Sequence, residues 1–171
     1  MKKYISAIII LIFISSTLNA QTFSFGPQLG FVKSIDADNT SLMPGMAVRL
    51  NLLGFGIEGS MYYKSEEFQN GNIKTKSYPI NLTAMFHLLP IIHGEVGLGW
   101  YNTQIDFSNP INSIKNETKN NAGYHLGIGT QIPVGNIYLT GDLRYVFLNI
   151  SSIASFKSDF YVVMVGAMIG F

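Results

Sequence analysis

The chain has 171 residues, of which 47% are hydrophobic and only 12% charged, and its 11 basic residues nearly balance its 10 acidic residues. This balance leaves no basic patch of the kind that nucleic-acid-binding proteins carry. The absence of cysteine excludes disulfides, thiolate metal sites and a lipid anchor on a cysteine. A chain of this length forms a single domain.

The first twenty residues have the pattern of a secretory signal peptide. Lys2 and Lys3 form a short basic segment, residues 5–14 form an apolar one, and small and polar residues lead up to Ala20. We therefore expect cleavage after Ala20, which leaves residues 21–171 as the mature domain. Loss of the two lysines leaves 9 basic against 10 acidic residues. A retained inner-membrane anchor is the alternative interpretation of this segment.

After the signal peptide, apolar residues alternate with polar residues or glycine in segment after segment, which is the period of a β-strand. The predicted strands span residues 22–32, 43–52, 55–64, 77–88, 94–105, 124–132, 137–147 and 159–171. Long polar loops are predicted at 33–42, 65–76, 106–121 and 151–158, and tight turns at 53–54, 89–93 and 133–136. Long and short connections thus alternate along the chain.

Two prolines interrupt this pattern, because each removes a backbone donor from the sheet. We expect Pro79 at the start of its strand, and Pro27 to mark a bulge or an irregular first strand.

Eight strands with one apolar face each predict an all-β fold, an eight-stranded antiparallel up-and-down transmembrane β-barrel. In lipid, only a closed sheet leaves no backbone edge unpaired. Such barrels have long external loops and short periplasmic turns, so both termini are expected on the periplasmic side. A soluble β-sandwich is the alternative, but it gives no reason for the charged residues to share the glycine-rich face.

Two stretches of the sequence resemble known outer-membrane proteins. The ending Gly166, Ile169 and Phe171 resembles the terminal assembly signal of bacterial outer-membrane β-barrels, although Val165 occupies a position that is usually polar. The segments YPINLTAMF and GEVGLGW, which begin at Tyr78 and Gly94, resemble the small outer-membrane β-barrel proteins often labelled porin family. This resemblance implies a monomer in the bacterial outer membrane, in contact with its lipid and with the barrel-assembly machinery. Most of that family has no assigned activity.

The inward face of the predicted barrel carries a polar network. Its members are Arg49, Glu58, His87, Glu95, His125, Asp142 and Arg144. Unpaired charges there would be costly, so we expect them to pair and to plug the lumen. A two-residue turn at 53–54 sets Leu52 opposite Phe55 and Arg49 opposite Glu58. Nine glycines on the same face leave a water-filled lumen as the alternative.

No catalytic, cofactor-binding or metal-binding residue is predicted. We expect His87 inside the periplasmic end, His93 in a periplasmic turn, and His125 near the external rim but facing the lumen. Lipid A-modifying barrel enzymes instead need a histidine with a serine or an acid at the lipid-facing rim, so that function is a remote alternative. No two histidines have ligand spacing on one strand face.

Aromatic residues are expected at the membrane interface. Trp100, Tyr124, Tyr145 and Tyr161 fit an interfacial girdle better than a binding platform.

Two functions remain open on the sequence. The first is a structural or interaction barrel that presents its external loops to a partner. The second is a narrow passive channel or small-ligand carrier, since eight strands enclose room only for side chains or one small ligand. We favour the first.

Overall fold

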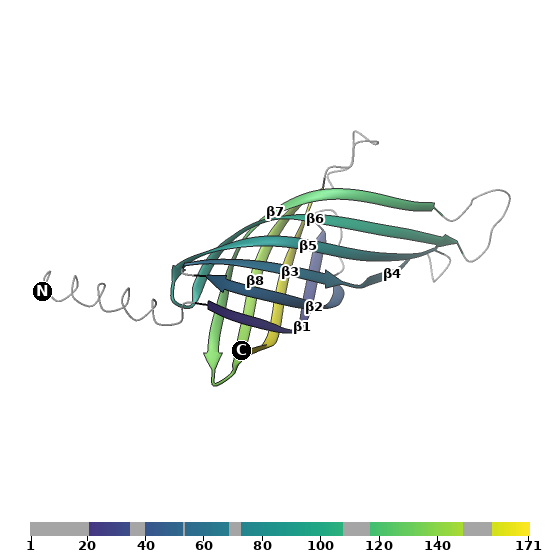
Figure 1. Ribbon diagram of the computed structural model, residues 1–171. Coiled ribbons are helices and arrows are strands. Elements are labelled where there is room, and N and C mark those ends of the chain that lie inside the picture. The colour runs from purple at the N-terminus through teal and green to yellow at the C-terminus, as the bar shows by residue number, and fades with distance from the viewer. Residues whose placement is uncertain (1–20, 35–39, 53, 69–72, 108–116, 149–158) are drawn as a thin grey trace, which may run out of the picture.

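The computed structural model describes residues 21–34, 40–52, 54–68, 73–107, 117–148 and 159–171. These residues form strands β1 (Gln21–Ser34), β2 (Thr40–Leu52), β3 (Phe55–Tyr62), β4 (Lys64–Phe68), β5 (Ile73–Leu89), β6 (Ile92–Phe107), β7 (Glu117–Val134), β8 (Ile137–Leu148) and β9 (Phe160–Gly170) (Figure 1). None of the described residues belongs to a helix long and apolar enough to cross a membrane. The predicted signal peptide, its cleavage site and the predicted loop at 151–158 lie outside the described residues.

The strands form one antiparallel sheet that closes on itself. Strands that follow one another in the chain lie side by side, and the first strand, β1, pairs with the last, β9. Strands β3 and β4 together make one barrel strand, because both pair with β5 in the same register: Met61 lies opposite Ile80, and Lys64 opposite Ser77. The barrel therefore has eight strands, and the predicted fold class is confirmed (Figure 1).

Tight turns join the strands at the end of the barrel where both β1 begins and β9 ends. Gly54 and Gly135 have φ angles of 86° and 65°, which favour glycine in two-residue hairpin turns. The register that follows from the first turn is confirmed, with Arg49 opposite Glu58. The predicted turn at 133–136 is too long, since Val134 already pairs with Ile137.

The predicted turn at 89–93 is also too long. Only Pro90 and Ile91 form the turn, and β6 begins at Ile92. His93 is therefore a strand residue, paired with Gly129 of β7, and its predicted place in a turn is wrong. Ile92 and His93 belong to β6 because their backbone pairs with β7. The pattern of one strand alone does not reveal such pairing.

Several predicted loop residues are also strand residues. Strand β2 begins at Thr40, β4 and β5 fill part of the predicted 65–76 loop, and β6 and β7 extend into 106–121. These extensions are rich in Thr, Ser, Asn, Lys and Glu, so apolar periodicity could not mark them. With 16 to 18 residues, β5, β6 and β7 exceed the roughly 9–11 residues that cross a bilayer. Their polar ends therefore project beyond the apolar part of the barrel.

The two prolines are accommodated without a bulge. Pairing of β1 with β9 has a gap at Gly26 and Pro27 but resumes in the same register. Pro79 lies well inside β5, not at its start as predicted, because the strand begins earlier at Ile73. Ile80 pairs with Met61 at the end of β3, and Ser77 pairs with Lys64 at the start of β4. Pro79 therefore lies opposite the break between β3 and β4, where no backbone hydrogen bond needs its missing N–H.

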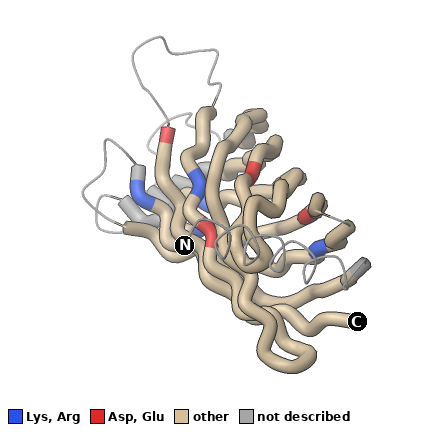
Figure 2. The backbone as a smooth tube through the Cα atoms, turned by 90° about the vertical axis from the view of Figure 1, so that its left-hand side faces the viewer, with Lys and Arg blue, Asp and Glu red and all other residues tan. Residues whose placement is uncertain are grey.

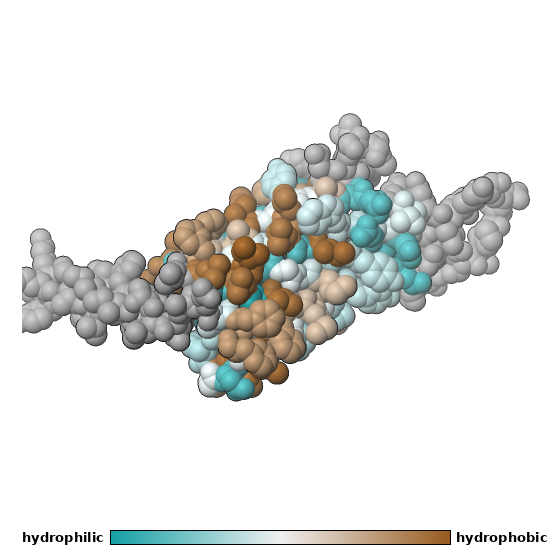
Figure 3. Space-filling model, viewed as in Figure 1, coloured by the Kyte–Doolittle hydropathy of each residue, from teal (hydrophilic) through white to brown (hydrophobic). Residues whose placement is uncertain are grey.

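The outer face of the barrel is apolar. Alternate side chains along the strands point outward and are apolar. Examples that are 41–51% exposed are Leu50, Ile57, Leu82, Leu126 and Val163. Figure 3 shows this apolar surface as a brown area, with hydrophilic residues gathered toward the end where the long strands project. Charged residues are sparse along the described strands, and both signs occur (Figure 2). An apolar wall with hydrophilic strand ends is what a barrel needs when its wall faces lipid and its rim faces water.

Candidate functional site in the barrel interior

Glycines on middle strands allow side chains from the strands on either side to meet inside the barrel. In one row, His93 of β6, Gly129 of β7 and Asp142 of β8 lie side by side. A Cβ on Gly129 would collide with both the His93 ring and the Asp142 carboxylate. Because glycine has no side chain, the two outer residues reach each other across the middle strand.

The same arrangement occurs in the neighbouring row. Glu95 of β6, Gly127 of β7 and Arg144 of β8 are aligned, and the Arg144 Nε donates to the Glu95 Oε2 at 2.5 Å. A Cβ on Gly127 would lie 3.0 Å from that carboxylate oxygen. Glycine at alternate positions of β7 therefore couples β6 to β8.

Five buried charged side chains, which we call the charged layer, are bonded to one another inside the lumen. They are Arg49, Glu58, Glu95, Asp142 and Arg144. Glu58 joins both guanidinium groups: Arg49 Nε donates to its Oε2 at 2.6 Å, and Arg144 Nη2 donates to its Oε1 at 2.8 Å. Arg49 Nη2 also donates to Asp142 Oδ2 at 2.6 Å. Charge-assisted bonds of this kind are the strong ones, and here they link β2, β3, β6 and β8.

Two glutamines add hydrogen bonds to the charged layer. Gln28 Nε2 donates to Glu58 at 3.3 Å, and Arg49 Nη1 donates to Gln131 Oε1 at 3.4 Å. Gln28 also accepts a hydrogen bond from the Tyr62 hydroxyl. Strands β1 and β7 are thereby tied into the layer.

The charged layer is not neutral. It holds three carboxylates and two guanidinium groups, all at most 5% exposed. One negative charge is thus left over among the described buried residues. A buried charge of this kind needs a compensating proton or cation.

The histidines occupy three different environments. His93, which the sequence did not place inside, is fully buried, and its Nε2 lies 3.0 Å from Glu95 Oε1 and 3.4 Å from Asp142 Oδ1. His87 is half-buried, with its ring centroid 5.6 Å from that of His93. His125 lies midway along β7 rather than near the external rim, and its Nε2 is 3.0 Å from the Thr83 hydroxyl.

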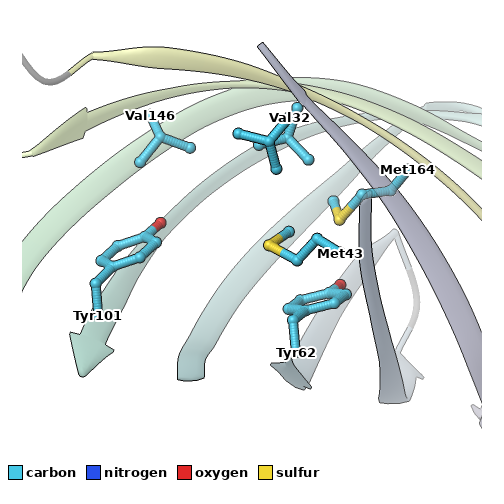
Figure 4. Close-up of a cluster of buried hydrophobic side chains, with 7 residues drawn as sticks. Val32, Met43, Tyr62, Tyr101, Val146 and Met164 are labelled. Atoms are coloured by element: carbon cyan, nitrogen blue, oxygen red, sulfur yellow. The ribbon is translucent and has the colours of Figure 1, made fainter. Parts of the chain in front are cut away.

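Toward the end opposite the tight turns, the lumen is filled by apolar side chains, which we call the apolar layer. Its members are Val32, Met43, Tyr62, Tyr101, Val146, Val162 and Met164. Figure 4 shows these side chains converging on one another from strands on opposite sides of the barrel. The sequence signal for this layer was the second face of β9, which carries Val162 and Met164 where polar residues are usual for a lumen.

The lumen glycines do not leave open space, because larger neighbours lie over them. A Cβ on Gly45 would collide with the Tyr62 ring, and one on Gly170 with the Tyr138 ring. A small cavity remains between the two layers, bordered by His125, with room for about one water molecule. The interior is thus packed through both layers.

The four predicted girdle residues all lie on the outer wall of the barrel, and three of them belong to one aromatic cluster. Tyr145 contacts Tyr161 with ring centroids 4.8 Å apart, and Phe147 at 4.5 Å. Tyr124 stacks on Phe147 at 4.7 Å, while Trp100 is 48% exposed on the same face. At the turn end, Phe171 stacks on Phe25 with centroids 5.9 Å apart.

Neither a family model nor a curated protein sequence matches the chain. Solved structures do match it. A major outer membrane protein from Thermus thermophilus superposes with a TM-score of 0.65 at 14% identity, over 89% of this chain and 100% of that one. The chain has the fold of the small outer-membrane β-barrels. Neisserial surface protein A has this fold too (TM-score 0.56, 13% identity, 88% and 95% covered).

The attachment invasion locus protein of Yersinia pestis is a third example of this barrel fold (TM-score 0.52, 17% identity, 88% of this chain and 97% of that one). These identities establish a shared fold. The predicted likeness to small outer-membrane barrels is therefore confirmed at the level of architecture.

Proposed function

We propose that this protein is an integral outer-membrane barrel that anchors projecting strands and external connections for contact with a partner, and that its lumen is sealed. The observation that carries this proposal is the packed interior. The charged layer ties strands from all sides together, and the apolar layer lies over it. An ion would have to break buried ion pairs and enter apolar packing to cross, which is costly.

The outer face supports the proposed location. An apolar wall, an aromatic cluster around Tyr145 and projecting polar strand ends match the layers of a bilayer and its interface. Contact with outer-membrane lipid as a monomer is part of the proposal. The outer-membrane location is supported by a solved bacterial outer membrane protein of the same fold.

We assign the barrel no catalytic role. His93 and His125 are buried in the lumen, and His87 lies beside His93. A lipid-modifying enzyme needs such groups at the lipid-facing rim, which these histidines do not reach.

We also propose that Gly166, Ile169 and Phe171 are read by the barrel-assembly machinery. Ile169 and Phe171 lie on the outer face, 43% and 74% exposed, and are open to contact before lipid surrounds them. Deletion of Phe171 should lower the amount of assembled barrel in the outer membrane while secretion across the inner membrane continues. Unchanged assembly would contradict this role.

The test of the sealed lumen is single-protein conductance in a planar bilayer. Refolded protein should first migrate faster on an unboiled gel than after boiling, which shows that the barrel has formed. We then expect at most brief, small conductance steps. A stable large conductance would overturn the sealed-lumen proposal and favour a passive channel.

A further inference from the structure

We propose that His93, Glu95 and Asp142 form a binding site for one divalent transition-metal ion, with Zn²⁺ as the best fit. The three residues come from two strands, β6 and β8, that meet across Gly129. Their ligand atoms all lie within 4.8 Å of one another. Only His93 and Glu95 lie on the same strand, and Asp142 reaches them from β8. The sequence alone therefore did not predict this site.

The distances fit a metal. Nitrogen and oxygen ligands about 2.0–2.2 Å from a tetrahedral Zn²⁺ lie about 3.3–3.5 Å from each other. His93 Nε2 lies 3.0 Å from Glu95 Oε1 and 3.4 Å from Asp142 Oδ1. Small rotations of the side chains therefore suffice to place all three atoms around one ion.

The carboxylates are already oriented for this role. Arg49 Nη2 donates to Asp142 Oδ2 at 2.6 Å, and Arg144 Nε donates to Glu95 Oε2 at 2.5 Å. Arg144 Nη2 makes a second, longer bond to Glu95 Oε1 at 3.3 Å. The other oxygen of each carboxylate turns toward His93. Partners of this kind fix the direction of metal ligands and tune their affinity.

An unsatisfied group points into the site. Asp142 is only 3% exposed, and its Oδ1 has no hydrogen-bond partner among the described residues. A buried carboxylate oxygen without a donor is costly. A divalent cation between Oδ1 and the His93 ring would satisfy it. The ion would change the net charge of the charged layer from −1 to +1, which an anion at the fourth position would balance.

The ligand set selects the class of ion. One imidazole with two carboxylates suits Zn²⁺ and its neighbours, whereas Mg²⁺ and Ca²⁺ prefer oxygen ligands alone. Three protein ligands leave a fourth position for water or a small anion. The site lies near the turn end of the barrel, since His93 is the second residue of β6, and the half-buried His87 borders it on that side.

The experiment uses refolded, tag-free barrel, stripped of metal with a chelator and shown to be folded by its migration on unboiled gels. Titration calorimetry with Zn²⁺, and metal analysis of the desalted protein, should give one ion per chain. His93→Gln should weaken binding at least about tenfold, because it removes the imidazole ligand. Gly129→Ala should weaken it as well, since its methyl group would occupy the space between the His93 ring and the Asp142 carboxylate.

Two matched controls decide where the ion binds. His125→Gln removes another buried lumen histidine, and His87→Gln removes the one beside the site; both variants should bind Zn²⁺ as the parent does. Loss of binding in His87→Gln with retention in Gly129→Ala would place the ion at the turn and overturn the proposal. So would the absence of a one-to-one complex in the folded parent.

X-ray absorption of the zinc-loaded parent provides a readout that needs no variant. We expect one imidazole nitrogen and otherwise oxygen neighbours around the ion. Two or more imidazoles, or oxygens alone, would contradict the assignment even if His93→Gln failed to fold.

Discussion

The charged layer and the apolar layer fill the same barrel, yet they depend on their neighbours in different ways. In the charged layer, Glu58 is bonded to both Arg49 and Arg144, so one side chain serves two partners with fixed directions. In the apolar layer, Met43 and Met164 pack without directional bonds. The first should tolerate almost no change of chemistry, and the second should tolerate any side chain of similar volume.

The largest expected effect is in the charged layer. Glu58→Leu leaves both guanidinium groups buried without their shared acceptor, and should lower the free energy of unfolding by about 3–5 kcal/mol. Glu58→Gln keeps an acceptor oxygen and should cost less. Urea unfolding of the refolded barrel in detergent or lipid measures both. Equal losses for the two variants would show that the ion pairs do not set this layer's stability.

The apolar layer should respond to volume instead. Met164→Ala should cost about 2–5 kcal/mol, because the truncation leaves a void beside the small cavity that Met164 already lines. Met164→Leu should cost under about 1.5 kcal/mol. The same unfolding assay applies. A Leu variant as unstable as the Ala variant would contradict the picture of non-directional packing.

A third variant tests the lumen glycines, which leave room for side chains from neighbouring strands to meet. A Cβ on Gly97 would meet the His125 ring and the Leu82 carbonyl oxygen, so Gly97→Ala should cost about 1–3 kcal/mol from overpacking. Gly59 has nothing within 4 Å of its Cβ position and is the matched control. Gly59→Ala should change the unfolding free energy by no more than about 0.5 kcal/mol.

The smallest effect is expected at the boundary between the layers. Thr83→Val removes the hydroxyl that bonds His125 at 3.0 Å and should cost about 1 kcal/mol. If the unfolding free energy falls by as much as in Glu58→Leu, then the charged layer extends to His125 and the division into two layers is wrong.

The sequence could predict contacts between residues on neighbouring strands, but not contacts between residues separated by another strand. Arg49 and Glu58 flank a two-residue turn, so their pairing followed from counting residues. His93 and Asp142 meet across a third strand, and that juxtaposition requires the registers of two hairpins at once. Alternation alone fixed which face each residue occupies, but not which residues on that face meet.

Strand ends were predicted less well than strand centres for a related reason. The apolar pattern reports contact with lipid, so it stops where the wall leaves the membrane. The Thr-, Ser- and Asn-rich ends of β5, β6 and β7 continue to pair beyond that level, and their hydrogen bonds leave no apolar trace. Pro79 was misplaced in the same way, since the start of β5 carries no apolar alternation.

The closure between β1 and β9 has a consequence for the order of folding. Every other pairing joins strands that follow one another, so hairpins can form locally and add in sequence. The pairing of Ser24 with Gly170 joins the first strand of the barrel to the last, so the entropy cost of closing this long loop falls on a single step. Contacts such as Phe25 with Phe171 form only then, and should be among the last to appear during refolding.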